Sequence, residues 1–304
     1  MNVAFEGNFR SSDKGEAPLR KIEVEQSFTW GEKVIRIPAI YIFEKGVVLD
    51  LCVQADENKF NAFMKKLKSD GESEELDAEN PLAFSANITL ALDGKTLISK
   101  QSCSMAWHPN TEAEPMALKY EELCEEYGCT GVGVFWRGSF AWNGEKVSSP
   151  KQSALDISAC KTPVTVGKFT TSDSFEPFEI EVMHPQTKKA HLVAVEGCKD
   201  ELFDEKIAFN NRFEFPRCYK ALSYRVSPPC EDIIIQDIAQ SDHPKSADGD
   251  CIGGAIGLIY MHDEADNEAV TVSSSAHFEP AKAVDWRIAF NIAPYPDGHI
   301  AFNL

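Results

Sequence analysis

The sequence contains no long hydrophobic run. No segment approaches the ~18 consecutive apolar residues that a membrane-spanning helix requires. Residues 1–20 are mostly polar and include no apolar stretch of signal-peptide length. From these absences we expect a soluble protein with no leader peptide, located in the cytoplasm.

Basic residues are few relative to acidic ones. The chain has 30 Lys and Arg against 48 Asp and Glu, so its formal net charge is −18 at pH 7. Affinity for nucleic-acid backbones and anionic lipid depends on Lys and Arg. We therefore expect neither a nucleic acid nor a membrane as partner. The excess of acidic residues favours solubility. Binding of a cation or of a basic partner is the alternative interpretation.

The nine cysteines lack the spacing of a metal site or a disulfide framework. No two of them lie two residues apart, and their number is odd. A zinc site requires close ligand pairs, and a secreted disulfide-rich domain usually has an even set. We therefore expect free thiols in a reducing compartment, and no cofactor. Cys52 lies in an apolar run, where a thiol behaves as a small hydrophobic group.

Alternating apolar residues are the main positive signal. In the segment 284–292, Val284, Trp286, Ile288, Phe290 and Ile292 are apolar, and the residues between them are mostly polar. A period of two predicts a half-buried β-strand, with Trp286 on the core side. The same alternation predicts strands at residues 47–53, 86–92, 178–182 and 220–226.

Turn residues connect several of these strands. Asp93-Gly94 between alternating runs is the strongest short hairpin signal, because both central positions of such a turn need a positive φ. The segments 44–46 and 184–187 predict two further hairpin turns.

Two segments have helical periodicity. Residues 57–68 follow Asp56, a good N-cap, and place Phe60, Phe63, Met64 and Leu67 on one face. Residues 115–127 begin at a proline, precede Gly128 and carry a second apolar stripe.

These elements predict a mainly β protein with two β-sandwich-like domains of antiparallel strands. At ~150 residues per domain the length suggests two domains. Residues 143–163 are rich in serine, lysine and small residues and are the expected linker. The first domain would then be a β-rich unit, residues 1–150, with both helices, and the second would be residues 160–304. A single large curved sheet is the alternative architecture.

One predicted strand, residues 130–142, has a face rich in aromatic side chains. Trp136 and Trp142 on that face are weak candidates for a ligand platform for a sugar ring or a peptide, with Gly138 leaving room between the rings. The unbroken apolar run toward Val132 favours the alternative, in which this face is core and Gly138 marks a bend or bulge.

A hydrolase-like arrangement can also be drawn. Cys251 is a candidate nucleophile because two glycines follow it, and their amides could stabilise an oxyanion. His262 or His277 would be the base. A Ser/His pairing can also be drawn, because His277 alternates with Ser273 and Ser275 on one strand face. However, no nucleophile-elbow motif is present. With so many cysteines and histidines, such a pairing also arises by chance.

Clustered carboxylates raise the question of Ca²⁺. Asp248, Asp250, Asp263 and Asp266 are hard oxygen ligands in two turns, but neither turn has the twelve-residue calcium-loop pattern.

From the sequence, then, we expect a non-enzymatic binding or interaction module whose partner is a protein, a peptide or a glycan. Strand edges and loop tips would make the contacts. The alternatives are the hydrolase around Cys251, His262 and His277, and glycan binding at Trp136 and Trp142.

Overall fold

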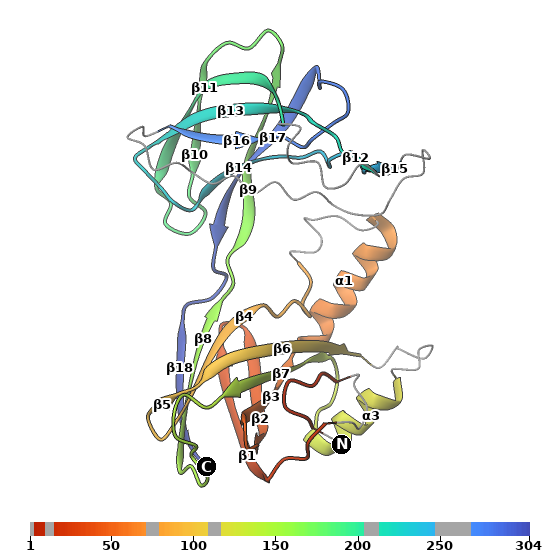
Figure 1. The fold of residues 1–304 in the computed structure, drawn as a ribbon, viewed down its shortest axis with the longest axis vertical. Helices are drawn as coiled ribbons and strands as arrows, with labels where there is room; N and C mark the ends of the chain where they lie inside the picture. The colour runs from red at the N-terminus through yellow and green to blue at the C-terminus, as the bar shows by residue number, and fades with distance from the viewer. Residues whose placement is uncertain (1–2, 10–14, 71–78, 109–116, 204–212, 247–268) are drawn as a thin grey trace. The chain divides into compact units, whose positions relative to one another are not determined.

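A computed structural model describes residues 3–9, 15–70, 79–108, 117–203, 213–246 and 269–304 (Figure 1). The described chain is built mainly of antiparallel β-strands with two α-helices, which confirms the predicted fold class. It divides into two units. Unit 1 comprises residues 1–160 together with 293–304, and unit 2 comprises residues 161–292.

Unit 1 contains two antiparallel sheets. The strands of sheet A are β1 (Arg20–Trp30), β2 (Lys33–Ile42), β3 (Gly46–Gln54), β6 (Ile98–Trp107) and β7 (Gly133–Ala141), in the order β1-β2-β3-β7-β6. The strands of sheet B are β4 (Ala86–Leu92), β5 (Lys95–Thr96), β8 (Gln152–Ala159) and β18 (Gly298–Asn303), in the order β18-β8-β4-β5. Together they form a β-sandwich-like unit.

The core of unit 1 lies between these sheets because alternate side chains of each strand face it. Leu49 and Leu51 of β3 pack there with Leu90 of β4 and Leu155 of β8, and all four are fully buried. This burial agrees with the alternation predicted for residues 47–53.

The other face of sheet A is also covered. The helix α3 (Ala117–Tyr127) and the segment 3–9 contribute buried apolar residues to it, among them Leu123 and Phe9. As a result, the second set of side chains on β3, including Asp50 and Cys52, is buried as well. Sheet A is therefore the middle layer of unit 1.

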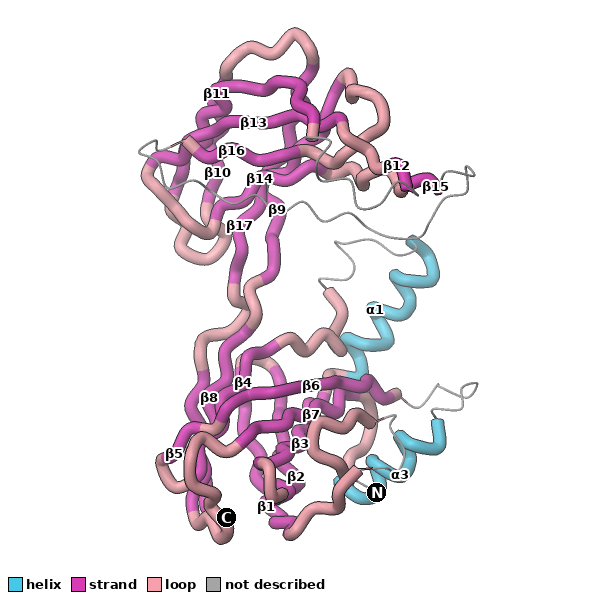
Figure 2. Tube along the Cα trace, in the orientation of Figure 1, coloured by secondary structure: helices cyan, strands magenta, loops and turns pink. Residues whose placement is uncertain are grey.

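Both predicted helices are present (Figure 2). In α1 (Glu57–Asp70) the N-cap is Asp56, whose Oδ1 accepts hydrogen bonds from Asn58 N at 2.8 Å and Lys59 N at 3.0 Å. Such a cap satisfies amides that have no partner within the helix. The prediction for residues 115–127 is confirmed over 117–127, and residues 115–116 lie outside the described part.

The turn at Asp93-Gly94 is formed as predicted. The φ angles are 47° at Asp93 and 78° at Gly94, in the left-handed region that this hairpin type requires. The Asp93 carboxylate also accepts hydrogen bonds from the backbone N of Lys151 and Gln152, which join the turn to the start of β8.

Unit 2 is a second sandwich-like arrangement. Its strands are β9 (Thr162–Ser172), β10 (Phe178–Met183), β11 (Ala190–Leu202), β12 (Phe213–Glu214), β13 (Cys218–Ser227), β14 (Ile233–Asp237), β15 (Lys245–Ser246), β16 (Val270–Ser273) and β17 (Ala283–Ile292). Sheet C has the order β14-β17-β9, sheet D has the order β10-β11-β13-β16, and β12 pairs with β15. Trp286 of β17 is fully buried between sheets C and D, as predicted for the closing strand.

The units differ from the expected domains at two places. Strand β18 pairs with β8, so residues 293–304 belong to unit 1 although they follow unit 2 in the chain. Residues 143–163, expected to be a linker, contain β8, which pairs with both β4 and β18. Among the described residues, no helix is both long and apolar enough to cross a bilayer.

Candidate functional site

A groove of about 380 Å³ lies on the outer face of sheet B. Its walls are polar side chains of β4, β8 and β18, together with the turn before β18. The lining residues are Asn87, Thr89, Asp156, Ile157, Ser158, Asp297, Gly298 and His299. The polar set faces outward because the alternate residues of the same strands, such as Leu155, are buried against sheet A.

Strand register aligns the groove side chains in rows. His299 lies directly opposite Asp156, which lies opposite Thr89 on its other side. His299 Nδ1 is 2.6 Å from Asp156 Oδ1. In the next row Asn87 lies opposite Ser158. The groove therefore presents hydroxyl, amide, imidazole and carboxylate groups on one open surface, where they can hydrogen-bond a ligand.

The second candidate is a buried charged network in unit 1. Arg137 of β7 donates from Nε to Asp50 Oδ1 at 2.7 Å and from Nη2 to Asp50 Oδ2 at 2.6 Å. The Tyr127 hydroxyl of α3 also donates to Asp50, and it lies 2.9 Å from the Tyr41 hydroxyl. The ring of Phe9 stacks on the guanidinium at 4.5 Å. These contacts fix α3 and the segment 3–9 onto sheet A.

Burial controls the protonation of this network. Burial alone lowers the pKa of Arg137, but the charge and hydrogen bonds of Asp50 outweigh it and hold that pKa above its usual value. Burial, and then the charge of Asp50, raise the pKa of Tyr127 and of Tyr41. The network is therefore one ion pair with two neutral phenols. Because its contacts join sheet A to α3, we assign it to holding α3 in place.

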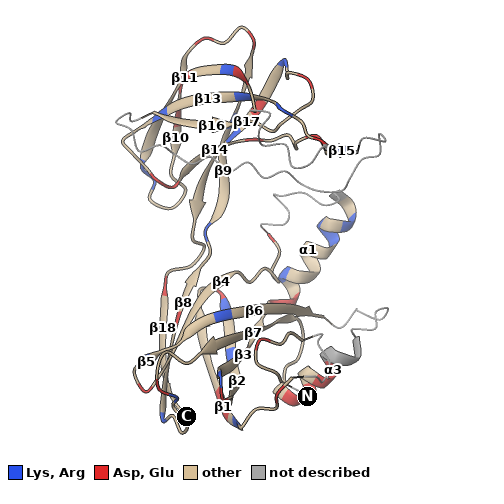
Figure 3. Cartoon of the chain, in the orientation of Figure 1, with Lys and Arg blue, Asp and Glu red and all other residues tan. Residues whose placement is uncertain are grey.

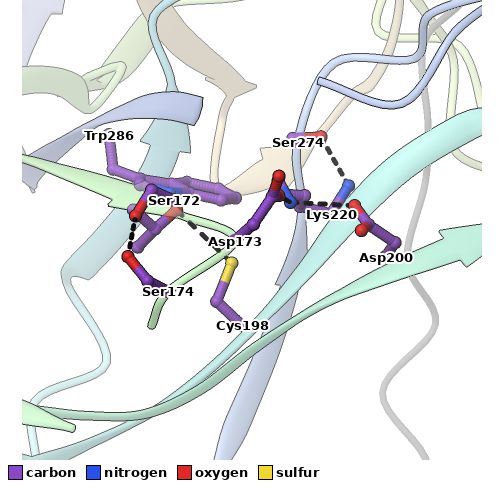
Figure 4. A network of polar contacts seen from close by, with 9 residues as sticks. Ser172, Asp173, Ser174, Cys198, Asp200, Lys220, Ser274 and Trp286 are labelled. Atoms are coloured by element: carbon purple, nitrogen blue, oxygen red, sulfur yellow. Dashed lines mark hydrogen bonds and ion pairs between the residues drawn. The ribbon is translucent and has the colours of Figure 1, made fainter. Parts of the chain in front are cut away.

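A third polar network surrounds Lys220 of β13 in unit 2 (Figure 4). The side chain of Lys220 is 3% exposed, and its Nζ donates to Asp173 Oδ1 and Asp200 Oδ1, each at 2.9 Å. Its backbone N donates to Ser274 Oγ at 2.8 Å. The two carboxylates are more than half exposed, so the ammonium lies inside and its counter-charges lie at the surface.

Lys220 is held in its charged form. Burial lowers its pKa, but the hydrogen bonds and charges of Asp200 and Asp173 outweigh burial, and the net change is upward. A nucleophilic lysine needs the opposite, a neutral amine at working pH. We therefore interpret Lys220 as a structural cation. It joins β13 to β11 and to the turn after β9.

Beside Lys220, Figure 4 shows a short chain of contacts that ends in the core. Thr171 Oγ1 accepts from Trp286 Nε1 at 2.8 Å and from Cys198 Sγ at 3.3 Å. The indole N–H of this core tryptophan is thus satisfied, as a buried donor requires.

Trp136 and Trp142, the candidates for a ligand platform, lie in different environments. Trp136 is 6% exposed and belongs to the core between sheets A and B, and Trp142 is half-buried and donates from Nε1 to Phe43 O at 3.2 Å. A Cβ placed on Gly138 would lie 2.3 Å from Trp136 Cη2. The space above Gly138 is therefore filled by the indole of Trp136 itself. Trp142 is only half-buried, and its contact with a ligand stays a prediction.

Of Cys251, His262 and His277, the structure describes only His277. Its Nδ1 is 3.2 Å from Asp242 Oδ1. The pKa of Asp242 lies below its usual range, first because Phe278 N donates to the carboxylate and then because of His277. Cys251 and His262 lie outside the described residues, so their arrangement with His277 stays a prediction.

The predicted calcium ligands cannot be placed in the fold. Asp248, Asp250, Asp263 and Asp266 all lie outside the described residues. Within the described part, no group of three or more His, Cys, Asp or Glu side chains is arranged to hold a metal ion.

Sequence reasoning missed the groove, the Asp50–Arg137 pair and the burial of the Lys220 ammonium. A signal for the pair exists, since Asp50 interrupts the apolar run of β3 and Arg137 interrupts that of β7. Charged residues are almost never fully buried unless paired, so two such interruptions indicate partners. The groove has no comparable signal, because alternating polar residues are typical of any solvent-facing strand.

Comparison with protein-family models, with curated proteins and with solved structures found no match to this chain.

Proposed function

We propose that this protein is a non-enzymatic binding module, and that its groove on sheet B takes up an extended peptide segment bearing Lys or Arg side chains. The groove itself supports this proposal. It is open, lies on a regular sheet and is lined by hydrogen-bonding side chains that include two carboxylates, Asp156 and Asp297.

Charge favours a basic ligand. Acidic positions are spread over the strands and turns of both units (Figure 3), and the chain carries a net charge of −18. Such a surface attracts cationic segments over a distance of about a Debye length, ~8–10 Å at physiological salt. Asp156 and Asp297 would then pair with the Lys or Arg side chains after contact.

The lining favours a peptide over a glycan. Apart from His299, no residue that lines the groove carries a ring on which a sugar could stack. A peptide needs no such platform, because Asn87, Thr89 and Ser158 offer amide and hydroxyl groups for its backbone.

Fluorescence anisotropy with short labelled peptides tests the proposal. Peptides with Lys or Arg at alternate positions should bind, and the same peptides with neutral citrulline or norleucine should not. The double variant Asp156→Asn/Asp297→Asn should weaken binding about 2- to 30-fold, since exposed ion pairs contribute ~0.2–1 kcal/mol each. Binding should also weaken as salt rises.

A charge-matched control is Glu231→Gln/Glu279→Gln, which removes two exposed carboxylates of unit 2. This variant should bind like the unmodified protein. An equal loss of affinity in both double variants would mean non-specific attraction, and a complete lack of peptide binding would refute the proposal.

A further inference from the structure

A cavity of about 470 Å³ lies beside α1 in unit 1. This volume is within the range of ~300–1,000 Å³ that is usual for small-molecule sites. The described lining consists of five residues of α1 and the residue that follows β6, namely Phe60, Asn61, Met64, Lys65, Lys68 and His108. None of them lines the groove on sheet B, so the cavity is a separate site.

Helical periodicity brings polar and apolar side chains together on this face of α1. Asn61, Met64, Lys65 and Lys68 are spaced i, i+3, i+4 and i+7, and residues at this spacing are neighbours on a helix surface. The two lysines are exposed, and Met64 is half-buried. The stripe therefore carries a thioether and two ammonium groups side by side.

The floor of the cavity is apolar. Phe60 is 4% exposed, and its ring centroid lies 5.3 Å from that of His108. Met64 lies one turn further along the helix, and its flexible, polarisable side chain can adapt to an apolar ligand. An alkyl chain placed on this floor would be removed from water, which is favourable in proportion to the area covered.

The ionisable side chains of the cavity are basic. No acidic residue of the described chain lines it. Two other lysines of α1 form ion pairs with Glu32 and Glu79, whereas Lys65 and Lys68 make no ion pair with any residue that the structure describes. Figure 3 shows the basic positions of α1 in blue. In a chain with a net charge of −18, these two ammonium groups beside an apolar floor favour an anionic ligand.

We propose that this cavity binds a small amphipathic carboxylate, with its alkyl chain against Phe60 and Met64 and its carboxylate paired with Lys65 and Lys68. Both parts of the ligand are matched by the lining. Two lysines three residues apart on one helix face can reach the same carboxylate, and the apolar floor covers the chain. The proposal does not depend on peptide binding by the groove on sheet B.

Methionine NMR on the full chain tests the proposal at the site itself. Protein labelled with ¹³C in its methionine methyl groups is titrated with sodium decanoate below the concentration at which decanoate forms micelles. The signal of Met64, assigned with Met64→Leu, should shift and saturate. The signal of Met183, which is 55% exposed in unit 2, should not change. An unchanged Met64 signal, or equal shifts of both signals, would overturn the proposal.

Ligand analogues separate the contributions of the chain and the charge. Octanoate should bind about 16-fold more weakly than decanoate, since each buried methylene strengthens binding about 4-fold. Uncharged 1-octanol should bind about 2- to 30-fold more weakly than octanoate, because it forms neither of two exposed ion pairs. Equal affinity for octanoate and decanoate, or for octanol and octanoate, would contradict the proposed binding mode.

Substitutions on α1 test the role of the two lysines. Lys65→Gln/Lys68→Gln should weaken decanoate binding about 2- to 30-fold and leave octanol binding unchanged. The control Lys59→Gln/Lys66→Gln removes the same charge from the same helix at residues that do not line the cavity, and it should bind decanoate like the unmodified protein. An equal loss in both double variants would mean non-specific attraction and would also overturn the proposal.

Discussion

Replacing Arg137 with methionine would leave the Asp50 carboxylate buried without its counter-ion. The two side chains are 2% and 1% exposed, so water cannot replace the guanidinium. Two charge-assisted hydrogen bonds are lost, and among the described residues the Tyr127 hydroxyl still donates to Asp50. Because both residues lie in the layer that joins sheet A to α3, the change should destabilise unit 1.

The magnitude follows from the cost of leaving a buried charge unpaired. Removing one partner of a buried ion pair typically costs ~3–5 kcal/mol. A total stability of ~5–15 kcal/mol is usual for a domain, so the loss would amount to between about a fifth of that stability and all of it. For a unit of this size each kcal/mol lowers Tm by about 2–4 °C, which gives a decrease of roughly 6–20 °C.

Urea unfolding followed by tryptophan fluorescence measures this effect selectively. Four of the five tryptophans, Trp30, Trp107, Trp136 and Trp142, lie in unit 1, so the signal reports mainly on that unit. The double variant Asp50→Leu/Arg137→Met should recover most of the lost stability, because an apolar pair can replace a buried ion pair at little cost. The reasoning is refuted if Arg137→Met costs less than ~1 kcal/mol, or if the double variant is less stable than Arg137→Met alone.

Two further variants each test one contact, the first in unit 1 and the second in unit 2. Gly138→Ala should destabilise unit 1 by ~1–3 kcal/mol, since the new Cβ would lie 2.3 Å from the Trp136 ring in a filled core; an unchanged Tm would contradict that packing. Asp173→Asn/Asp200→Asn should cost unit 2 ~2 kcal/mol at pH 7, because the buried Lys220 ammonium loses both counter-charges. The folded-state pKa of Lys220 is raised, so this contribution is complete below its unfolded pKa of ~10.4 and is lost as pH rises through the folded value. Thermal unfolding should therefore show the difference between this double variant and the unmodified protein shrinking above about pH 10.4, and a difference that is independent of pH would contradict the assignment.

Local patterns in the sequence predicted individual elements well. The alternation in residues 284–292 predicted a strand with Trp286 in the core, and the structure has β17 there. Asp93-Gly94 predicted a hairpin turn, and both residues have the required positive φ angles. Asp56 and the apolar stripe behind it gave α1. These predictions are confirmed because strand alternation, turn conformation and helix capping depend on residues that are neighbours in sequence.

Positions that depend on distant partners could not be predicted in this way. Residues 160–304 looked like one domain, yet β18 pairs with β8, so the chain returns to unit 1 at its end. The sequence allowed two interpretations of the aromatic face at Trp136 and Trp142, a core or a ligand platform. Trp136 is part of the core because sheet B covers it. The groove likewise exists only because β18 lies beside β8 and brings His299 opposite Asp156.

The sequence by itself determined that this protein is mainly β, which residues alternate between the faces of its strands, and where α1 begins. Only the tertiary structure decided what covers each face. Asp50 alternates with apolar residues as a solvent-facing side chain does, but α3 and the segment 3–9 cover its face of sheet A and bury it. Its partners Arg137 and Tyr127 are 87 and 77 residues away in the chain. Local periodicity fixes the direction of a side chain, whereas the environment it enters is set by contacts at such separations.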